Sequence, residues 1–217
     1  MLANLFLHYA FDVWMEREHP TVRFERYCDD AVVHCVSEGQ AHRVARGIAD
    51  RMAEVGLKLH PAKTRIVYCK DGSRRQQYPR VAFTFLGFTF RPRPAWTKNG
   101  VVFASFQPAI SNEALKRISG EVRQWRLHHW VGLDIDQVAR RINPIVRGWM
   151  QYYGAFYRSV LNPLLQRING YVMRWLRKKY RRLRNVKRAA AAWQRITSQQ
   201  PRLFAHWAWA AASWRTG

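Results

Sequence analysis

Short apolar runs separated by polar turns characterise the first half of the chain. Alternating or continuous apolar residues predict strands, which are expected within residues 21–36, at 65–69, at 81–90 and at 101–106. In the third run Leu86-Gly87 interrupts the alternation of four phenylalanines, which predicts a hairpin turn or a bulge at that point. The polar residues 70–80 predict a loop.

Helical spacing of apolar residues appears twice among these strands. Residues 2–15 predict a largely buried helix that ends near residues 17–20. Residues 41–55 carry an apolar stripe, with Ser37 and Gln40 placed as a capping box before it and Gly56 placed to end it. Strands and helices mixed in this order predict an α+β arrangement for residues 1–104.

From residue 105 onward the pattern is helical. Ser111 can cap a helix that runs to about Trp130, and Asp134 with Gln137 can cap a second helix. The pair Asn143-Pro144 is expected to kink or interrupt that second helix.

A third helix is expected over about residues 163–184, ending in a basic run. The aromatic residues between Trp193 and Trp214, including His206, Trp207 and Trp209, are expected to pack the end of the helical bundle.

The charge of the chain changes at the same place as its pattern. The 217 residues have a formal net charge of +23, and residues 105–217 carry 21 Lys and Arg against 4 Asp and Glu. No acidic residue follows Asp136, yet eight of the ten tryptophans lie in this part. Disordered segments are poor in aromatic residues, so a folded basic module that binds a polyanion is expected. Aromatic rings interleaved with arginine favour RNA over a membrane surface.

The densest basic run lies within residues 174–188, where nine residues are Lys or Arg and none is acidic. A solvated helix face is the simplest account of a charge run. Because this run is unbalanced and follows Tyr171 and Trp175, phosphate contact is favoured instead. The residues expected to make that contact are Arg174, Arg177, Lys178, Lys179, Arg181 and Arg182.

The chemistry most visible in the sequence is the pair Asp29-Asp30 between two strand-like runs. Asp is common in turns, so the pair could simply shape a hairpin. Adjacent carboxylates repel each other, however, and Mg²⁺ is typically held by one or two carboxylates together with substrate phosphates. Two such ions would support phosphodiester chemistry on a nucleic acid.

Other features exclude several alternatives. Cys28, Cys35 and Cys69 fit no zinc spacing, and three reduced cysteines predict an intracellular protein. No apolar run approaches the roughly 20 residues that cross a bilayer, and the N-terminus does not look like a signal peptide. We therefore expect a cytoplasmic, nucleic-acid-associated protein with no membrane partner.

Five segments, in order, resemble the reverse transcriptases/maturases encoded by group II introns. Tyr27-Cys28-Asp29-Asp30 resembles the Tyr-x-Asp-Asp box of reverse transcriptases. Residues 2–14 resemble a segment downstream of a template-contacting glycine motif, and residues 56–64 resemble a palm segment that ends in Lys-Thr. Residues 85–88 resemble the primer-gripping hairpin, and residues 148–156 resemble the maturase signature. The resemblance implies the end of a polymerase palm over residues 1–104 and a helical thumb and maturase region over 105–217.

The resemblance also implies roles for single residues. Asp29 and Asp30 would hold the catalytic Mg²⁺ ions, and Tyr27 would lie beside the primer end. Lys63 would approach the leaving pyrophosphate, with an exposed palm lysine as the alternative. The primer would be seated by Phe85, Leu86 and Gly87. Intron RNA would be bound by the maturase region, including Arg147, Trp149, Tyr152 and Tyr153.

One departure from the family pattern affects the expected activity. A further metal-binding aspartate of the family would precede Met1, as would the fingers that grip template and nucleotide. We therefore expect a C-terminal portion, arising from a truncated gene, a split gene with a partner chain, or an internal start. Such a piece is not expected to polymerise DNA alone, which primer extension with Mg²⁺ on an RNA template would test.

Two functions follow from these observations. The first is an RNA-directed DNA polymerase that works on an RNA/DNA primer-template and assists intron splicing and mobility. The alternative is an RNA-binding maturase or splicing factor without catalysis, or the C-terminal half of a split reverse transcriptase.

Overall fold

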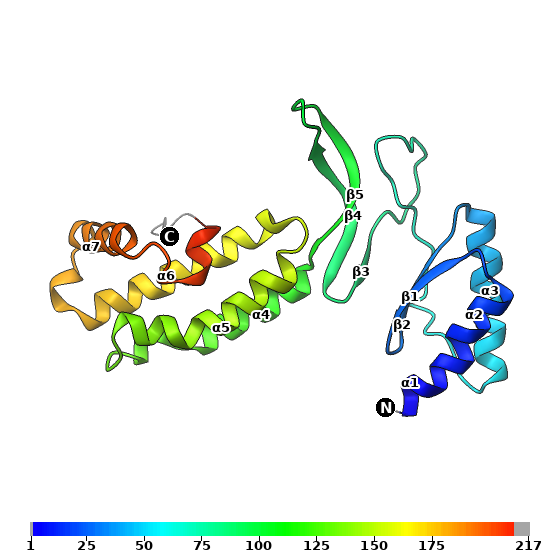
Figure 1. Cartoon of the computed structure of the whole chain (residues 1–217), viewed down its shortest axis with the longest axis horizontal. Coiled ribbons are helices and arrows are strands. Elements are labelled where there is room, and N and C mark those ends of the chain that lie inside the picture. The colour runs from blue at the N-terminus through cyan, green and yellow to red at the C-terminus, as the bar shows by residue number, and fades with distance from the viewer. Residues whose placement is uncertain (1, 211–217) are drawn as a thin grey trace. The chain divides into compact units, whose positions relative to one another are not determined.

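The computed structural model describes residues 2–210, which form two compact units (Figure 1). Of these residues, the first unit comprises 2–85 and 94–105, and the second comprises 86–93 and 106–210. Helices and small sheets occur together, so the expected α+β class is confirmed. The expected boundary at residue 105 between palm and thumb stays a prediction.

The first unit begins with one helical segment, as the apolar spacing predicted. It consists of α1 (Leu2–Leu7), a π-helical turn η1 (His8–Asp12) and α2 (Val13–Glu18). The expectation that this segment is largely buried is wrong, because the side chains of Leu2, Leu5, Phe6 and Tyr9 are 47–82 % exposed. Strands β1 (Arg23–Tyr27) and β2 (Asp30–His34) then form an antiparallel hairpin in which Tyr27 pairs with Asp30. The long helix α3 (Glu38–Glu54) follows.

A small core holds these elements together. Phe11 and Met15 of the N-terminal segment pack with Val22 and with Val44 and Met52 of α3, all at most 8 % exposed. The hydroxyl of Ser37 accepts a hydrogen bond from the Gln40 amide at 3.2 Å, so the predicted cap of α3 is confirmed. The Gln40 side chain accepts from the amide of Val36, one residue before the position a capping box would use.

The strand expected at residues 65–69 is wrong. These residues are irregular, although the Tyr68 amide donates to the Arg80 carbonyl at 2.9 Å and the Lys70 amide donates to the Tyr68 carbonyl at 2.9 Å. A ladder requires successive bonds to one neighbouring strand, and the second of these bonds turns the chain back on itself. The polar residues 70–80 form a loop, as expected.

A second sheet has the strand order β3-β4-β5, with bounds Phe83–Phe85, Phe88–Trp96 and Val102–Ile110. Leu86 and Gly87 join β3 to β4 with φ angles of 50° and 78°. Two successive left-handed residues are typical of a type I′ turn, so the predicted turn is confirmed. The last strand extends four residues beyond the expected end and includes Pro108, which an edge strand tolerates.

The second unit is a helical bundle built from α4 (Asn112–Gln124), α5 (Ile135–Tyr153), α6 (Asn162–Lys179) and α7 (Val186–Gln199). Short turns of 3₁₀-helix connect or follow them: η2 (Leu127–His129), η3 (Arg158–Leu161), η4 (Arg181–Leu183) and η5 (Ala205–Ala208). Caps at Ser111 and at Asp134 with Gln137 are confirmed, the latter as a full capping box. Two of the expected helices end earlier than predicted, α4 at Gln124 and α6 at Lys179.

The expected break at Asn143-Pro144 is wrong, because α5 continues through both residues. Pro144 leaves one carbonyl of the helix without its amide donor. The apolar face of α5, with Val138, Ile142 and Val146 at most 1 % exposed, packs in the core and keeps the segment helical. Asn143 is itself buried, donates to the Leu203 carbonyl and accepts from the Ala205 amide, both at 2.9 Å.

The centre of the bundle is the fully buried Trp175 of α6, whose Nε1 donates to the Trp130 carbonyl at 2.9 Å. His206 and Trp207 close one end of the core and Trp209 packs against it, as expected for these aromatic residues. Trp214 lies outside the described residues.

Candidate metal site and nucleic-acid interface

The carboxylates of the Asp-Asp motif lie at the tip of the β1–β2 hairpin. Alternation along β1 half-buries Phe24 and Arg26, while Glu25 and Tyr27 are exposed. Cys28 occupies the turn with a φ of 54°, a left-handed conformation that is uncommon for a residue with a Cβ. Asp29 and Asp30 follow it and are exposed.

The hairpin tip is fixed to the N-terminal helical segment by Arg26. Its Nε and Nη2 donate to the two carboxylate oxygens of Asp12, each at 2.6 Å, and its Nη1 donates to the Cys28 carbonyl at 2.8 Å. These side chains are only 13 % and 17 % exposed. The Arg26 hydrogen bonds hold the pKa of Asp12 below its ordinary value, so Asp12 is an ionised partner for the guanidinium. We call this arrangement the Asp12–Arg26 clamp.

Breaking the clamp should be costly. We expect Asp12→Ala to lower the free energy of unfolding of the first unit by about 1–2 kcal/mol, because it removes two charge-assisted hydrogen bonds from a mostly buried guanidinium. Urea unfolding would measure the change, and amide hydrogen exchange would show whether the hairpin opens more often. Glu18→Ala is the matched control, since its ion pair with Arg17 is largely exposed and should contribute below about 0.5 kcal/mol. Equal losses in both variants would contradict the clamp.

The two carboxylates at the tip have no hydrogen bond or ion pair within residues 2–210. The same residues contain no cluster of three or more His, Cys, Asp and Glu that could hold a metal. Two adjacent hard oxygen donors without a competing cation fit an ion that takes its remaining ligands from water and phosphate. The donor set at the tip therefore fits Mg²⁺ as part of a complex with a phosphate-containing substrate.

Two other predicted catalytic residues lie on the surface. Tyr27 ends β1 and is 62 % exposed. Lys63 is exposed in a turn in which its amide donates to the His60 carbonyl at 3.1 Å. Its ammonium group makes no ion pair with Asp29 or Asp30 in the described part of the chain. Its proximity to the reacting groups stays a prediction.

The predicted primer-binding turn is held by one residue of α5 and by the N-cap residue of α4. Tyr152 Oη donates to the Leu86 carbonyl at 2.9 Å, and the Ser111 amide donates to the Gly87 carbonyl at 2.8 Å. A Cβ at Gly87 would lie 3.1 Å from Tyr153 Oη, so both its φ and this close approach require glycine. Phe85, the third residue of the prediction, ends β3 and is half-buried.

The four residues predicted to bind RNA from α5 differ in exposure. Tyr153 is 6 % exposed and its hydroxyl accepts from Arg117 at 2.9 Å, while Trp149 is half-buried and stacks on Trp125 at a centroid distance of 5.7 Å. Arg147 is exposed and Tyr152 is 49 % exposed. The surface therefore offers Arg147 and Tyr152 to a ligand, whereas Tyr153 and Trp149 mainly pack the unit.

Sequence reasoning did not identify Phe88 and Phe156 as candidate binding residues. The centroid of the Phe88 ring lies 5.2 Å from that of Tyr152 and 5.6 Å from that of Phe156. Phe156 is the last residue of the signature, but the sequence spacing does not predict that it lies close to Phe88 of β4.

The predicted basic run divides into two groups. Arg177 Nη2 donates to the Arg184 carbonyl at 2.9 Å and Lys179 Nζ donates to the Val131 carbonyl at 2.8 Å, so both hold the end of α6. Lys178, Arg181 and Arg182 are exposed.

Arg174 is also exposed and lies over the Tyr171 ring at 4.2 Å. Partial desolvation lowers the pKa of His128. Electrostatic repulsion by its neighbours lowers it further, and these are His129, Lys178, Arg126 and Arg174. The end of α6 and the turn after α4 therefore form one positive surface, suited to phosphates.

Two family models match the chain. Residues 1–90 match reverse transcriptase (RNA-dependent DNA polymerase), and residues 115–195 match the group II intron, maturase-specific domain. No curated protein matches the chain. Within residues 2–210 no helix is long and apolar enough to cross a membrane.

The two matches lie in the order that the sequence motifs predicted, and the reverse transcriptase match includes the Asp29-Asp30 hairpin. The alternative of an RNA-binding maturase or splicing factor without catalysis is therefore not favoured. The chain belongs to the group II intron reverse transcriptases/maturases and is, by family, an RNA-directed DNA polymerase with nucleic-acid partners.

Proposed function

We propose that this protein holds Mg²⁺ at the carboxylates of Asp29 and Asp30 and uses its second unit to bind group II intron RNA. The observation that carries the metal proposal is a pair of exposed carboxylates, free of cationic partners in the described residues, on a turn that the Asp12–Arg26 clamp fixes. A fixed turn keeps the two carboxylates at a constant distance and orientation, which favours a metal ion that both of them bind.

When bound, the ions would lower the pKa of the primer 3′-hydroxyl and neutralise charge on the incoming triphosphate. The chain would contribute the position of the reacting groups. Tyr27, exposed beside the tip, would support the primer end, and Leu86 and Gly87 would seat its backbone in a turn held by Tyr152. Lys63 would offer a proton or a positive charge to the leaving pyrophosphate.

The second unit supplies the charge for RNA. Its exposed lysines and arginines at the end of α6 lie in a part of the chain with no acidic residue after Asp136. Neutralising phosphates releases counterions from RNA, so this surface supports affinity without reading sequence. The RNA/DNA primer-template and an upstream partner chain with fingers belong to the same proposal.

Metal binding tests the first part directly. Mn²⁺, followed by its electron paramagnetic resonance signal, is expected to bind weakly, with a Kd on the order of a millimolar, since the hairpin tip offers two carboxylates and residues 2–210 place no cluster of three or more metal-ligating side chains there. Asp29→Asn and Asp30→Asn should each abolish that binding. Asp50→Asn, which removes an exposed carboxylate from α3, should leave it unchanged.

Activity gives a second readout with the same variants. Whatever Mg²⁺-dependent extension of a primer on an RNA template the protein supports, alone or with an added partner chain, should disappear in Asp29→Asn and persist in Asp50→Asn. Mn²⁺ binding or extension that survives the loss of Asp29 would overturn the metal proposal.

A further inference from the structure

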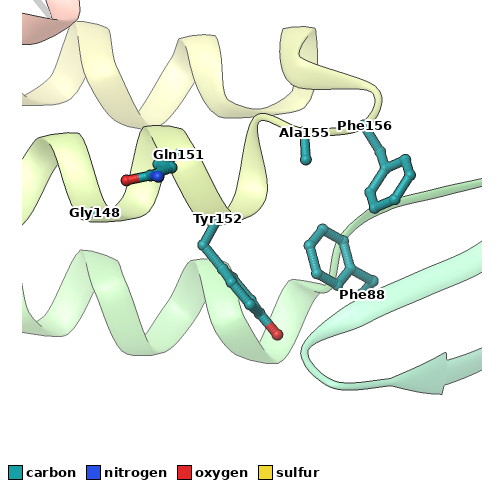
Figure 2. A pocket seen from close by; sticks show the side chains of 6 residues that line it. All are labelled: Phe88, Gly148, Gln151, Tyr152, Ala155 and Phe156. Atoms are coloured by element: carbon teal, nitrogen blue, oxygen red, sulfur yellow. The ribbon is translucent and has the colours of Figure 1, made fainter.

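A small cavity of about 480 Å³ lies in the second unit where the signature of α5 meets the start of β4. Figure 2 shows its lining, which consists of Phe88, Gly148, Gln151, Tyr152, Ala155 and Phe156. We call it the aromatic slot. Gly148, Gln151 and Tyr152 lie on α5, and Phe156 follows the end of that helix.

The rings of the slot differ in how far they are exposed. Phe88 is 7 % exposed, whereas Tyr152 and Phe156 are 49 % and 52 % exposed. Phe156 meets Phe88 edge-on, at an interplanar angle of 89°, and the hydroxyl of Tyr152 is held by the Leu86 carbonyl. A buried ring therefore anchors two rings that keep much of their surface open to a ligand.

Gly148 leaves the helix surface bare beside Tyr152. A Cβ built at this glycine meets no atom within 4 Å, so packing within the unit does not require a glycine there. Glycine in a helix interior costs roughly 0.5–1 kcal/mol relative to alanine. The glycine therefore lowers the stability of the helix without relieving a contact in the unit, and its effect is to leave the slot without a side chain at this position.

The charge around the slot selects the class of ligand. None of its lining residues is charged, and Gln151 supplies an amide for hydrogen bonds. The exposed Arg147 directly precedes Gly148 on α5, so a positive charge lies beside the slot. A flat apolar group on an anionic backbone complements this combination, and an unpaired nucleobase of RNA is such a group.

We propose that the aromatic slot stacks one unpaired base of a bound single-stranded RNA segment between Tyr152 and Phe156. This inference rests on the proposed RNA binding and adds to it a preference for single-stranded over double-stranded segments. A paired base has both faces covered by its neighbours in the duplex, so only an unpaired base can enter. The amide of Gln151 would contact the edge of that base.

Gly148→Leu tests the slot by filling it. A Cβ at Gly148 meets no atom within 4 Å, so the substitution begins without a clash at the helix surface, and the helix gains a better helix former. Gly120→Leu is the matched control, because Gly120 lies inside α4, also has nothing within 4 Å of a built Cβ, and does not line the slot. Phe156→Ala removes one ring by an independent route.

Fluorescence anisotropy with a short single-stranded RNA and with a duplex of the same length would measure the effect. Gly148→Leu and Phe156→Ala are each expected to weaken single-strand binding about fivefold to a hundredfold, the range for one base–aromatic stack. Duplex affinity and the salt dependence of both RNAs should stay as in the unaltered protein, because no charge changes. Gly120→Leu should change neither affinity.

Three results would overturn the proposal. The first is unchanged single-strand affinity in both variants, while binding remains strong and salt-dependent; the proposed RNA function would then survive without the slot. The second is an equal loss for single strand and duplex. The third is a concentration-dependent dimer of the unaltered protein that Gly148→Leu disrupts in sedimentation velocity, since the slot would then receive a second copy. Absence of any RNA binding would remove both this inference and the proposed RNA function.

Discussion

Lowering the pH from 7 to 4 is expected to reduce the free energy of unfolding of the second unit by about 3 kcal/mol through His206 alone. His206 is fully buried, and its Nε2 donates to Asn169 Oδ1 at 2.6 Å. Its Nδ1 is buried and has no hydrogen-bond partner within residues 2–210. A second proton would therefore place an unpaired charge in the core, and burial lowers the pKa of His206 to about 4.

The sign of the effect follows from the lowered pKa. In the unfolded chain His206 takes up its proton near pH 6.5, while the folded unit resists protonation until about pH 4. The contribution of the neutral imidazole to stability is complete above pH 6.5 and is lost as the pH falls through 4. Urea unfolding at several pH values, followed by tryptophan fluorescence, would measure the loss.

A matched pair of variants isolates this residue from the carboxylates that also titrate in this range. His206→Gln keeps a donor toward Asn169 but cannot gain a charge, so its stability should depend less on pH between 6.5 and 4. His129→Gln, at an exposed position, should retain the full dependence. Identical pH profiles for His206→Gln and the unaltered protein would rule out His206 as the origin of the effect.

His206 also illustrates which parts of the fold could be predicted from the sequence. Its place at the end of the bundle followed from its aromatic neighbours, but its partner Asn169 lies 37 residues earlier and gives no local signal. Caps at Ser111 and Asp134 and the turn at Leu86-Gly87 were predictable because each depends on residues within four positions.

Predictions failed where distant contacts decide between local alternatives. Pro144 favours a break in a helix, yet burial of the apolar face of α5 maintains it. Residues 65–69 have the composition of a strand but lack a continuous partner.

The candidate site shows the same division. Asp29 and Asp30 are adjacent in sequence and could be found from their motif. The clamp that fixes them joins Arg26 to Asp12, 14 residues earlier, and the aromatic slot joins Phe88 to residues about 60 positions later. Neither pairing has a spacing that secondary-structure patterns would reveal.

The RNA surface at the end of α6 is expected to lose most of its electrostatic affinity when Lys178, Arg181 and Arg182 are replaced together by alanine. All three side chains are exposed and make no hydrogen bond or ion pair in the described residues, so they are available for phosphates. If each side chain contacts one phosphate, the negative slope of log K against log salt should become shallower by about two to three. Because log K changes linearly with log salt, the affinity at 0.1 M salt should fall about a hundredfold.

Two neighbouring residues of the basic run should behave differently. Arg177 and Lys179 donate to the carbonyls of Arg184 and Val131, so their replacement should lower the stability of the unit more than the salt slope. Replacing all five together would mix unfolding with lost phosphate contacts. The triple variant avoids this, and circular dichroism and urea unfolding should show it as stable as the unaltered protein.

A control with the same loss of charge separates a local surface from the overall field of the protein. Arg43, Arg46 and Lys58 are exposed residues of the first unit, and their joint replacement by alanine removes three positive charges there. If the surface at the end of α6 carries the contacts, this control should alter the salt slope by well under one. Equal changes in slope for the two triple variants would mean that net charge alone attracts RNA, and an unchanged slope in the first variant would show that RNA binds elsewhere on the molecule. Only a salt dependence that becomes shallower in the first variant and not in the control places the RNA at the end of α6.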